Sequence, residues 1–197
     1  MIHALPGMGG DHRMYQGVWN TLPNFIAHDW PAYQGETTIG TLAISVCDAC
    51  GIQDGDILVG SSLGGMVACE ILKTRRISKL FLVGSAISPQ EISPIFRIFH
   101  PLSGATLLKM LQRVTTHISY TATQMFASAD VNFMLAMRKA IFEWKGLEST
   151  EEIVRRIHGR SDFVIPLPDK VERVLDGGHL ITMTHAEECV DFIRRYV

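Results

Sequence analysis

The sequence carries little net charge and lacks any long apolar run. Its 197 residues have a formal net charge of −2, and charged side chains make up 19% of the chain. This balance provides no basic surface for nucleic acid or acidic lipid, so we expect neither as a partner. No stretch approaches the ~18 consecutive apolar residues of a membrane-spanning helix, and residues 1–12 lack the pattern of a secretory signal. These absences favour a globular protein of the cytoplasm.

Cysteine is scarce as well, with four residues scattered along the chain. So few thiols in a domain of this size do not make a disulfide framework, and we expect them to be reduced. Cys47 and Cys50 are spaced as C-x-x-C, but their apolar segment is typical of a helix that ends at Gly51. No second cysteine pair completes a zinc site, and the histidines show no metal-ligand spacing. We therefore expect no bound metal.

What the sequence does contain is a repeated alternation of strand and helix patterns. Short apolar segments are each followed by a turn and then by a segment with apolar residues at helical spacing. Such alternation is typical of a parallel sheet covered by helices on both faces. Strands are expected over residues 1–5, 24–30, 56–60, 79–86, 153–162 and 170–178. Helices are expected over residues 11–22, 38–51, 63–75 and 184–197, the last with Thr184 as its N-cap.

Residues 88–149 interrupt this alternation. Three prolines are followed by two helical patterns rich in Met and Phe, over residues 105–114 and 131–144. Nothing in the composition marks a linker or an independent domain. We interpret residues 1–197 as a single domain and 88–149 as a helical cap inserted over one edge of the sheet. Most of its Met and Phe side chains should be core, and some should line an apolar pocket.

The strongest functional signal is the stretch GSSLG at residues 60–64. It fits the pattern G-x-S-x-G and lies between a predicted strand and a predicted helix. A serine on such a tight turn takes a strained backbone conformation, and Gly60 and Gly64 allow the close packing that holds it. Ser62, at the centre of the pattern, is the expected nucleophile, with Ser61 as the alternative. A phosphate-binding loop would need a lysine after the second glycine, and the chain has Gly-Met there.

A serine nucleophile needs a base, and the base needs an orienting carboxylate. Asp162 follows one predicted strand, and His179 follows the next after two glycines that let the loop turn back. The chain order serine, aspartate, histidine is that of one hydrolase version of this triad. Other candidates stay open at this point. The alternative acids are Asp169 and Asp176, and the alternative bases are His158 and His185.

Four motifs in this order resemble the α/β-hydrolase superfamily over nearly the whole chain. LPGMGGDHRMY is similar to the oxyanion loop of that family, GSSLGG to its nucleophile elbow, IHGRSDFVIP to its acid loop and GGHLITMTHAEE to its histidine loop. The resemblance implies an α/β fold with a mostly parallel, doubly wound sheet. It also implies an oxyanion hole formed by the backbone N–H groups of Met8 and Leu63, which is physically reasonable beside a helix start.

Two features depart from the usual pattern of the family. Pro6 precedes Gly7 where the family often has a histidine, so the support that this histidine gives must come from elsewhere. The two strands that commonly precede the oxyanion loop are missing from the sequence, which implies a sheet of about six strands. Neither departure removes a catalytic group.

These residues and the resemblance predict a serine hydrolase of small molecules. It would cleave a carboxylic ester, thioester or amide of an apolar substrate through an acyl-enzyme, without any cofactor. The same fold supports other chemistries, so three alternatives stay open. They are an acyltransferase, a lyase in which His179 acts mainly as a base, and a non-catalytic protein that holds a small ligand.

Overall fold

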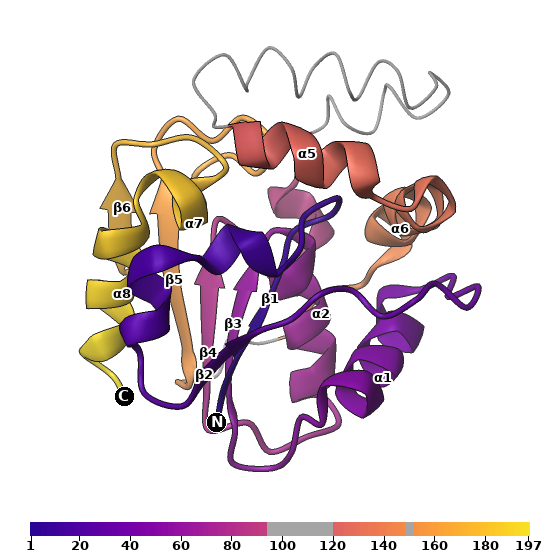
Figure 1. Ribbon diagram of the computed structural model, residues 1–197, viewed down its shortest axis with the longest axis horizontal. Helices are drawn as coiled ribbons and strands as arrows, with labels where there is room; N and C mark the ends of the chain where they lie inside the picture. The colour runs from indigo at the N-terminus through magenta and orange to yellow at the C-terminus, as the bar shows by residue number, and fades with distance from the viewer. Residues whose placement is uncertain (94–119, 149–151) are drawn as a thin grey trace.

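Figure 1 shows the computed structural model, which describes residues 1–93, 120–148 and 152–197. At its centre, six strands form one sheet in the order β2-β1-β3-β4-β5-β6, and every neighbouring pair is parallel. The predicted α/β class and the predicted sheet of about six strands are confirmed. The strands are β1 (Ile2–Leu5), β2 (Phe25–Ala27), β3 (Ile57–Ser61), β4 (Lys79–Val83), β5 (Val154–Gly159) and β6 (Arg173–Leu175).

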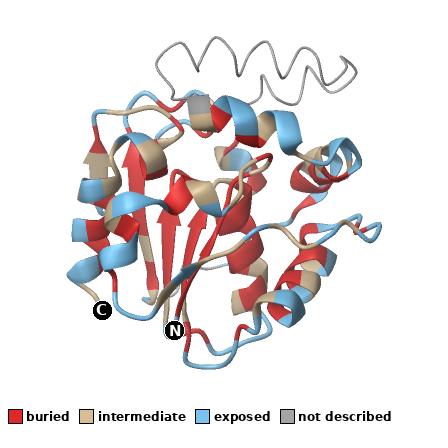
Figure 2. Cartoon of the chain, in the orientation of Figure 1, coloured by how far each residue is buried: buried red, intermediate tan, exposed pale blue. Residues whose placement is uncertain are grey.

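Buried side chains divide between two cores, one on each face of the sheet. In β3, Leu58 belongs to the core that includes α1 (Ile39–Cys50) and α2 (Leu63–Leu72). The next residue, Val59, belongs to the core that includes α8 (Ala186–Arg194). Successive strand residues point to opposite faces, so a strand covered on both sides is apolar throughout. Figure 2 shows the central strands β1, β3, β4 and β5 mainly buried, while the outer surfaces of the helices are exposed.

The chain reverses its direction across the sheet between β1 and β3. From β1 it crosses to β2 at one edge, and from β3 onward it proceeds through β4 and β5 to β6 at the other edge. The loops that leave β1 and β3 therefore diverge at neighbouring strand ends. In open parallel sheets, ligands bind in the crevice at such a point, outside the carboxyl ends of the strands.

Two predicted helix boundaries are wrong. In place of one helix over residues 11–22, the chain forms the short 3₁₀ helices η1 (His12–Tyr15) and η2 (Gly17–Thr21). Gly17 has a φ of 65°, which breaks the right-handed helical backbone between them. Thr184 does not cap the last helix, because it ends the short helix α7 (Ile181–Thr184) and its hydroxyl donates to the carbonyl of Leu180.

Two described helices belong to the predicted cap. They are α5 (Tyr120–Ser128) and α6 (Val131–Glu143), and α6 confirms the helix expected over residues 131–144. In Figure 1, α5 lies beyond the carboxyl ends of the strands, to which the arrowheads point. Met125, Phe133 and Met137 are buried. The helix expected over residues 105–114 lies outside the described residues, so the boundaries of the cap and the single-domain organisation stay predictions.

All four cysteines lie in helices as free thiols. Burial raises the pKa of Cys50 to about 11 and that of Cys69 to about 12, so both are protonated and unreactive at neutral pH. In the parts of the chain that the structure describes, no helix combines the length and the apolar character needed to cross a membrane.

The side chain of Trp19 should dominate the stability of the core beside α8. It is fully buried, and its indole N–H donates to the carbonyl of Thr182 at 2.9 Å. Replacing Trp19 by Ala should lower the free energy of unfolding by about 3–5 kcal/mol through cavity formation. Trp19→Phe keeps most of the packing but leaves this carbonyl unpaired, so it should cost about 1–3 kcal/mol. Urea denaturation followed by circular dichroism measures the free energy of unfolding of both variants. Equal losses in the two variants would contradict this division between packing and hydrogen bonding.

Candidate active site

Ser62 lies between the end of β3 and the start of α2, in a strained backbone conformation. Its φ of 50° and ψ of −118° place a residue with a side chain where glycine is normally required. Its carbonyl accepts hydrogen bonds from the Ser85 hydroxyl at 2.6 Å and from the amide of Gly65 at 3.0 Å. These contacts hold the turn, because a strained residue persists only where its surroundings fix it.

Glycines on both sides of Ser62 permit the close packing of this turn. A Cβ atom on Gly64 would collide with the carbonyl oxygens of Leu5 and Pro6, at the end of β1. A Cβ atom on Gly60 would collide with the backbone of Gly65 in the first turn of α2. The pattern G-x-S-x-G thus has a steric cause at both glycines, as predicted from the sequence.

Ser62, His179 and Asp162 form one chain of hydrogen bonds. The Ser62 Oγ atom lies 2.9 Å from His179 Nε2, and His179 Nδ1 lies 2.7 Å from Asp162 Oδ2. Because a carboxylate only accepts hydrogen bonds, Nδ1 carries the proton of the neutral imidazole. The lone pair of Nε2 then faces the serine hydroxyl, which is the orientation that a general base requires.

Loops at the carboxyl ends of β5 and β6 bring the acid and the histidine together. Asp162 lies in the turn after β5, and its Oδ1 atom accepts the amides of Val164 and Ile165, each at 2.9 Å. His179 follows β6, and its carbonyl lies against Gly84, where a Cβ atom would meet it at 2.9 Å. Gly84 has a φ of 57°, so both space and conformation call for glycine there.

The Asp162 carboxyl is ionised in this environment. Burial alone would raise its pKa, because it disfavours the charged form. The neighbouring His179, the hydrogen bonds from His158 and His179 and the backbone amide of Ile165 outweigh burial and hold the pKa of Asp162 well below its usual value. The site therefore contains a fixed negative charge beside the imidazole across the whole neutral range.

The alternative residues from the sequence lie elsewhere. Ser61 is fully buried, and its hydroxyl has no partner among the described residues. Asp169 and Asp176 are exposed, and the described contacts of His179 include neither. His185 bonds the Thr184 hydroxyl.

His158 lies close to the site, but on the far side of the acid. It is buried in β5, and its Nε2 atom lies 3.2 Å from Asp162 Oδ2. Two supporting contacts were not predicted from the sequence, namely this one and the Ser85 hydroxyl bond to Ser62. Neither residue belongs to a spacing pattern that could have indicated it.

The loop after β1 presents backbone amides next to Ser62. The amide of Gly10 donates to the carbonyl of Gly7 at 3.0 Å, which closes a turn with Met8 and Gly9 at its centre. Gly9 has a φ of 75°, as the third residue of a type II turn requires. A Cβ atom on Gly7 would lie 3.4 Å from the Cβ of Ser62. In the described turns, loops and helix caps, the amides of Met8 and Leu63 donate no hydrogen bond.

Two side chains bind the backbone of this loop at Gly7, the residue after Pro6. The Trp30 indole N–H donates to the carbonyl of Gly7 at 3.1 Å. The Met14 sulfur accepts the amide of Gly7 at 3.2 Å. Residues farther along the chain than Pro6 therefore hold the backbone of this loop at Gly7.

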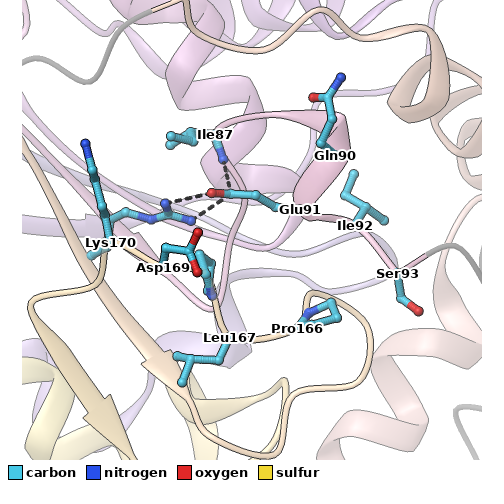
Figure 3. Close-up of a pocket in the computed structure, with 11 residues that line it drawn as sticks. Ile87, Gln90, Glu91, Ile92, Ser93, Pro166, Leu167, Asp169 and Lys170 are labelled. Carbon is cyan, nitrogen blue, oxygen red and sulfur yellow. Dashed lines mark hydrogen bonds and ion pairs between the residues drawn. The ribbon is translucent and has the colours of Figure 1, made fainter.

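Two cavities lie beside these loops. The first, of about 230 Å³, adjoins Gly9 and Gly10, and its lining combines Trp30, Tyr33, Met125 and Phe133 with Asp11, Asp29 and Asp130. The second, of about 400 Å³, lies between residues 87–93 and 166–170, as Figure 3 shows. At its wall, the Glu91 carboxylate accepts two hydrogen bonds from the buried Arg156 guanidinium, at 2.8 and 2.9 Å.

One group of side chains has the spacing to hold a metal ion. Ligand atoms of Asp11, His12 and Asp29 lie within 4.8 Å of one another. Asp11 is already paired with Arg13, and Asp29 accepts the amide and the ring nitrogen of His12. His12 and Asp29 are also exposed, which is common in acidic groups that bind no ion. This group does not argue for a metal, and the expectation of none stays a prediction.

Comparison with known proteins agrees with the geometry. The pattern of the Alpha/beta hydrolase family matches residues 2–192. None of the curated proteins matches this chain in sequence. Among solved structures, a thermophilic esterase from Thermogutta terrifontis is similar with a TM-score of 0.75 and 18% identity, over 99% of this chain and 88% of its own.

Two further structures show the same fold. The RedJ thioesterase of the prodiginine pathway in Streptomyces coelicolor has a TM-score of 0.72 and 18% identity, over 97% of this chain and 88% of its own. A mutant epoxide hydrolase from Bacillus megaterium has a TM-score of 0.68 and 15% identity, over 98% of this chain and 92% of its own. Because the family pattern covers nearly the whole sequence, this chain belongs to the α/β-hydrolase family.

Proposed function

We propose that this protein is a serine hydrolase that cleaves a carboxylic ester, thioester or amide through an acyl-enzyme. One observation carries the proposal, namely the hydrogen-bonded chain from Ser62 through His179 to Asp162 at a strained strand-to-helix turn. A protein that only binds a ligand has no need for this chain. Two structural neighbours are described as an esterase and a thioesterase, which supports the same class of reaction.

In the first half of the reaction, Ser62 becomes acylated. Its oxygen forms a bond to the substrate carbonyl carbon while His179 Nε2 takes the hydroxyl proton. The negative charge of Asp162 stabilises the imidazolium that forms. The bond to the alcohol, thiol or amine then breaks, and the leaving group takes the proton back from His179.

The developing oxyanion needs donors that are in place before the reaction. We assign this role to the backbone amides of Met8 and Leu63, which flank Ser62 from two different loops and donate no hydrogen bond in the described turns, loops and helix caps. Leu63 also begins α2, so the positive end of the helix dipole adds to the stabilisation. Preorganised donors of this kind contribute about 3–4 kcal/mol each to the barrier in acyl transfer.

In the second half, water releases the acyl group. His179 takes a proton from a water molecule as its oxygen attacks the acyl carbon, and the proton returns to the Ser62 oxygen when the acid leaves. In both halves of the reaction, His179 Nε2 accepts and returns the proton. The proposed reaction therefore needs no cofactor.

The substrate proposed here is small and apolar on at least one side of the reacting carbonyl. The cavity of about 230 Å³ next to the Met8 loop has Trp30, Tyr33 and Phe133 in its wall, together with Asp11, Asp29 and Asp130. A Cβ atom on Gly9 would also collide with the Phe126 ring, so α5 packs directly against the loop. Aromatic walls of this kind favour burial of an apolar group.

A fluorophosphonate probe should label the protein at Ser62 alone. The serine oxygen bonds to phosphorus, fluoride leaves, and His179 takes the proton. Ser62→Ala should abolish labelling. Ser61→Ala is the matched control, because the Ser61 hydroxyl has no partner to lose, and this variant should be labelled like wild type. Intact-mass spectrometry measures the adduct; an unlabelled wild-type protein, or equal labelling of Ser62→Ala, would refute the proposed nucleophile.

Substitutions of the acid and the base should lower turnover without unfolding the chain. Asp162→Asn keeps the size of the side chain but removes the charge and the correct histidine tautomer, so kcat should fall by about four orders of magnitude. The kcat of His179→Gln should fall at least as far. Initial rates with a panel of short nitrophenyl esters, together with thermal unfolding, measure both effects. A folded Asp162→Asn variant within tenfold of wild type would contradict the assigned role.

Hydrolysis can be separated from acyl transfer by competing acceptors. With a nitrophenyl ester as donor, we expect water to receive most of the acyl groups even when an alcohol or a thiol is present at millimolar concentration. Mass spectrometry of the products gives the partition. Transfer to the added acceptor as the main product would favour the acyltransferase alternative instead.

A further inference from the structure

One oxygen atom of Asp162 is shared between two imidazoles. Oδ2 lies 2.7 Å from His179 Nδ1 and 3.2 Å from His158 Nε2. The other oxygen, Oδ1, is occupied by two backbone amides. The carboxylate is therefore enclosed by four donors, and three of them come from residues other than the histidine that it orients.

The contacts of His158 fix which of its nitrogens carries hydrogen. Its Nε2 atom lies 2.8 Å from the carbonyl oxygen of Ile165, which can only accept. Nε2 is thus protonated and points at both the Ile165 carbonyl and Asp162 Oδ2. In this way, the His158 side chain contacts both ends of the turn from Asp162 to Ile165.

Solvent cannot take over this function. The His158 side chain is 1% exposed and the Asp162 side chain 0% exposed. Without His158, the Ile165 carbonyl and one side of the carboxylate would lose a donor that water cannot readily replace in so buried a position. The turn would then be free to move, and Asp162 moves with it.

We propose that His158 is a positioning residue for the reaction at Ser62, acting through Asp162 to fix the orientation and the charge of the acid that holds His179. The inference rests on the proposed function of the triad. His158 does not contact Ser62 in the described structure, so it is not a second base. A displacement of about 1 Å in such a chain can cost on the order of a hundredfold in rate.

The charged side chains near His158 on β5 form ion pairs with other residues. Arg156 binds Glu91, and Arg155 lies 3.8 Å from Glu172. From the loop after β6, His179 faces the other side of the carboxylate. Among the described residues, the two imidazoles are the titratable side chains in direct contact with Asp162.

Removal of the His158 donor gives a direct readout of this role. A donor at the position of Nε2 keeps both the Ile165 carbonyl and Asp162 Oδ2 paired, whereas a side chain without a donor leaves that carbonyl unpaired. The rate of reaction at Ser62 should therefore follow the presence of the donor rather than the size of the side chain.

Variants of His158 separate positioning from folding. His158→Gln places an amide N–H near the position of Nε2, whereas His158→Phe keeps the ring but has no donor. His158→Asn is a second donor-deficient variant, because its shorter amide does not reach Asp162. Fluorophosphonate labelling rates measured at neutral pH, with thermal unfolding of each variant, use the full chain and need no knowledge of the natural substrate.

The expected result is a labelling rate lowered about tenfold to a hundredfold in His158→Phe, and recovery of the rate in His158→Gln. If His158→Phe does not fold, His158→Asn should show the same change. Folded donor-deficient variants with the wild-type labelling rate would overturn the positioning role while leaving the triad intact. An equally slow rate in His158→Gln would reduce His158 to a structural residue. An unlabelled wild-type protein would instead refute the proposed function itself.

Discussion

The conformation of Ser62 is the constraint on which the site depends. A residue with φ of 50° is unstable by itself, yet it directs the serine hydroxyl away from both β3 and α2 and toward the loops of neighbouring strands. The surrounding backbone compensates, since Gly64 lets the end of β1 approach and the Ser85 hydroxyl fixes the Ser62 carbonyl. Without that approach, the loop that carries Met8 could not lie next to the serine.

Parallel topology explains how distant residues meet there. Ser62 and His179 are 117 positions apart in the sequence, and both follow strands whose carboxyl ends lie at the same edge of the sheet. Because the chain reverses direction between β1 and β3, the loops leaving those strands separate and leave room for a ligand. A charged carboxylate bonded to the histidine, which is in turn bonded to the serine, completes the arrangement that the proposed acyl transfer requires.

The sequence could predict those parts of the site that depend on local geometry. GSSLG could be recognised because it lies between a predicted strand and a predicted helix, and Gly60 is required by contact with Gly65 nearby, whereas Gly64 is required by the distant end of β1. Asp162 and His179 could be proposed because each follows a strand, but the choice over Asp169 and Asp176 depended on how the loops close. The contact between His158 and Asp162 was missed, since it depends on a turn that folds back on β5.

Errors in the fold have similar causes. Helical spacing over residues 11–22 is real, but Gly17 breaks it into two short helices, and spacing alone does not detect a positive φ. At Thr184 the capping preference was outweighed by the short helix α7, which ends at this residue. Local preferences predicted most of the described strands and helices, while tertiary contacts decided where some of them begin and end.

The most direct measurement is to identify the covalent intermediate. The protein is mixed with a nitrophenyl ester, quenched in acid during turnover, digested and examined by tandem mass spectrometry. An acyl group on Ser62, absent when the protein is denatured before mixing, is the predicted result. Turnover of the ester with the acyl group on another residue, or with Ser62 unmodified throughout, would contradict the assignment of Ser62 as the nucleophile.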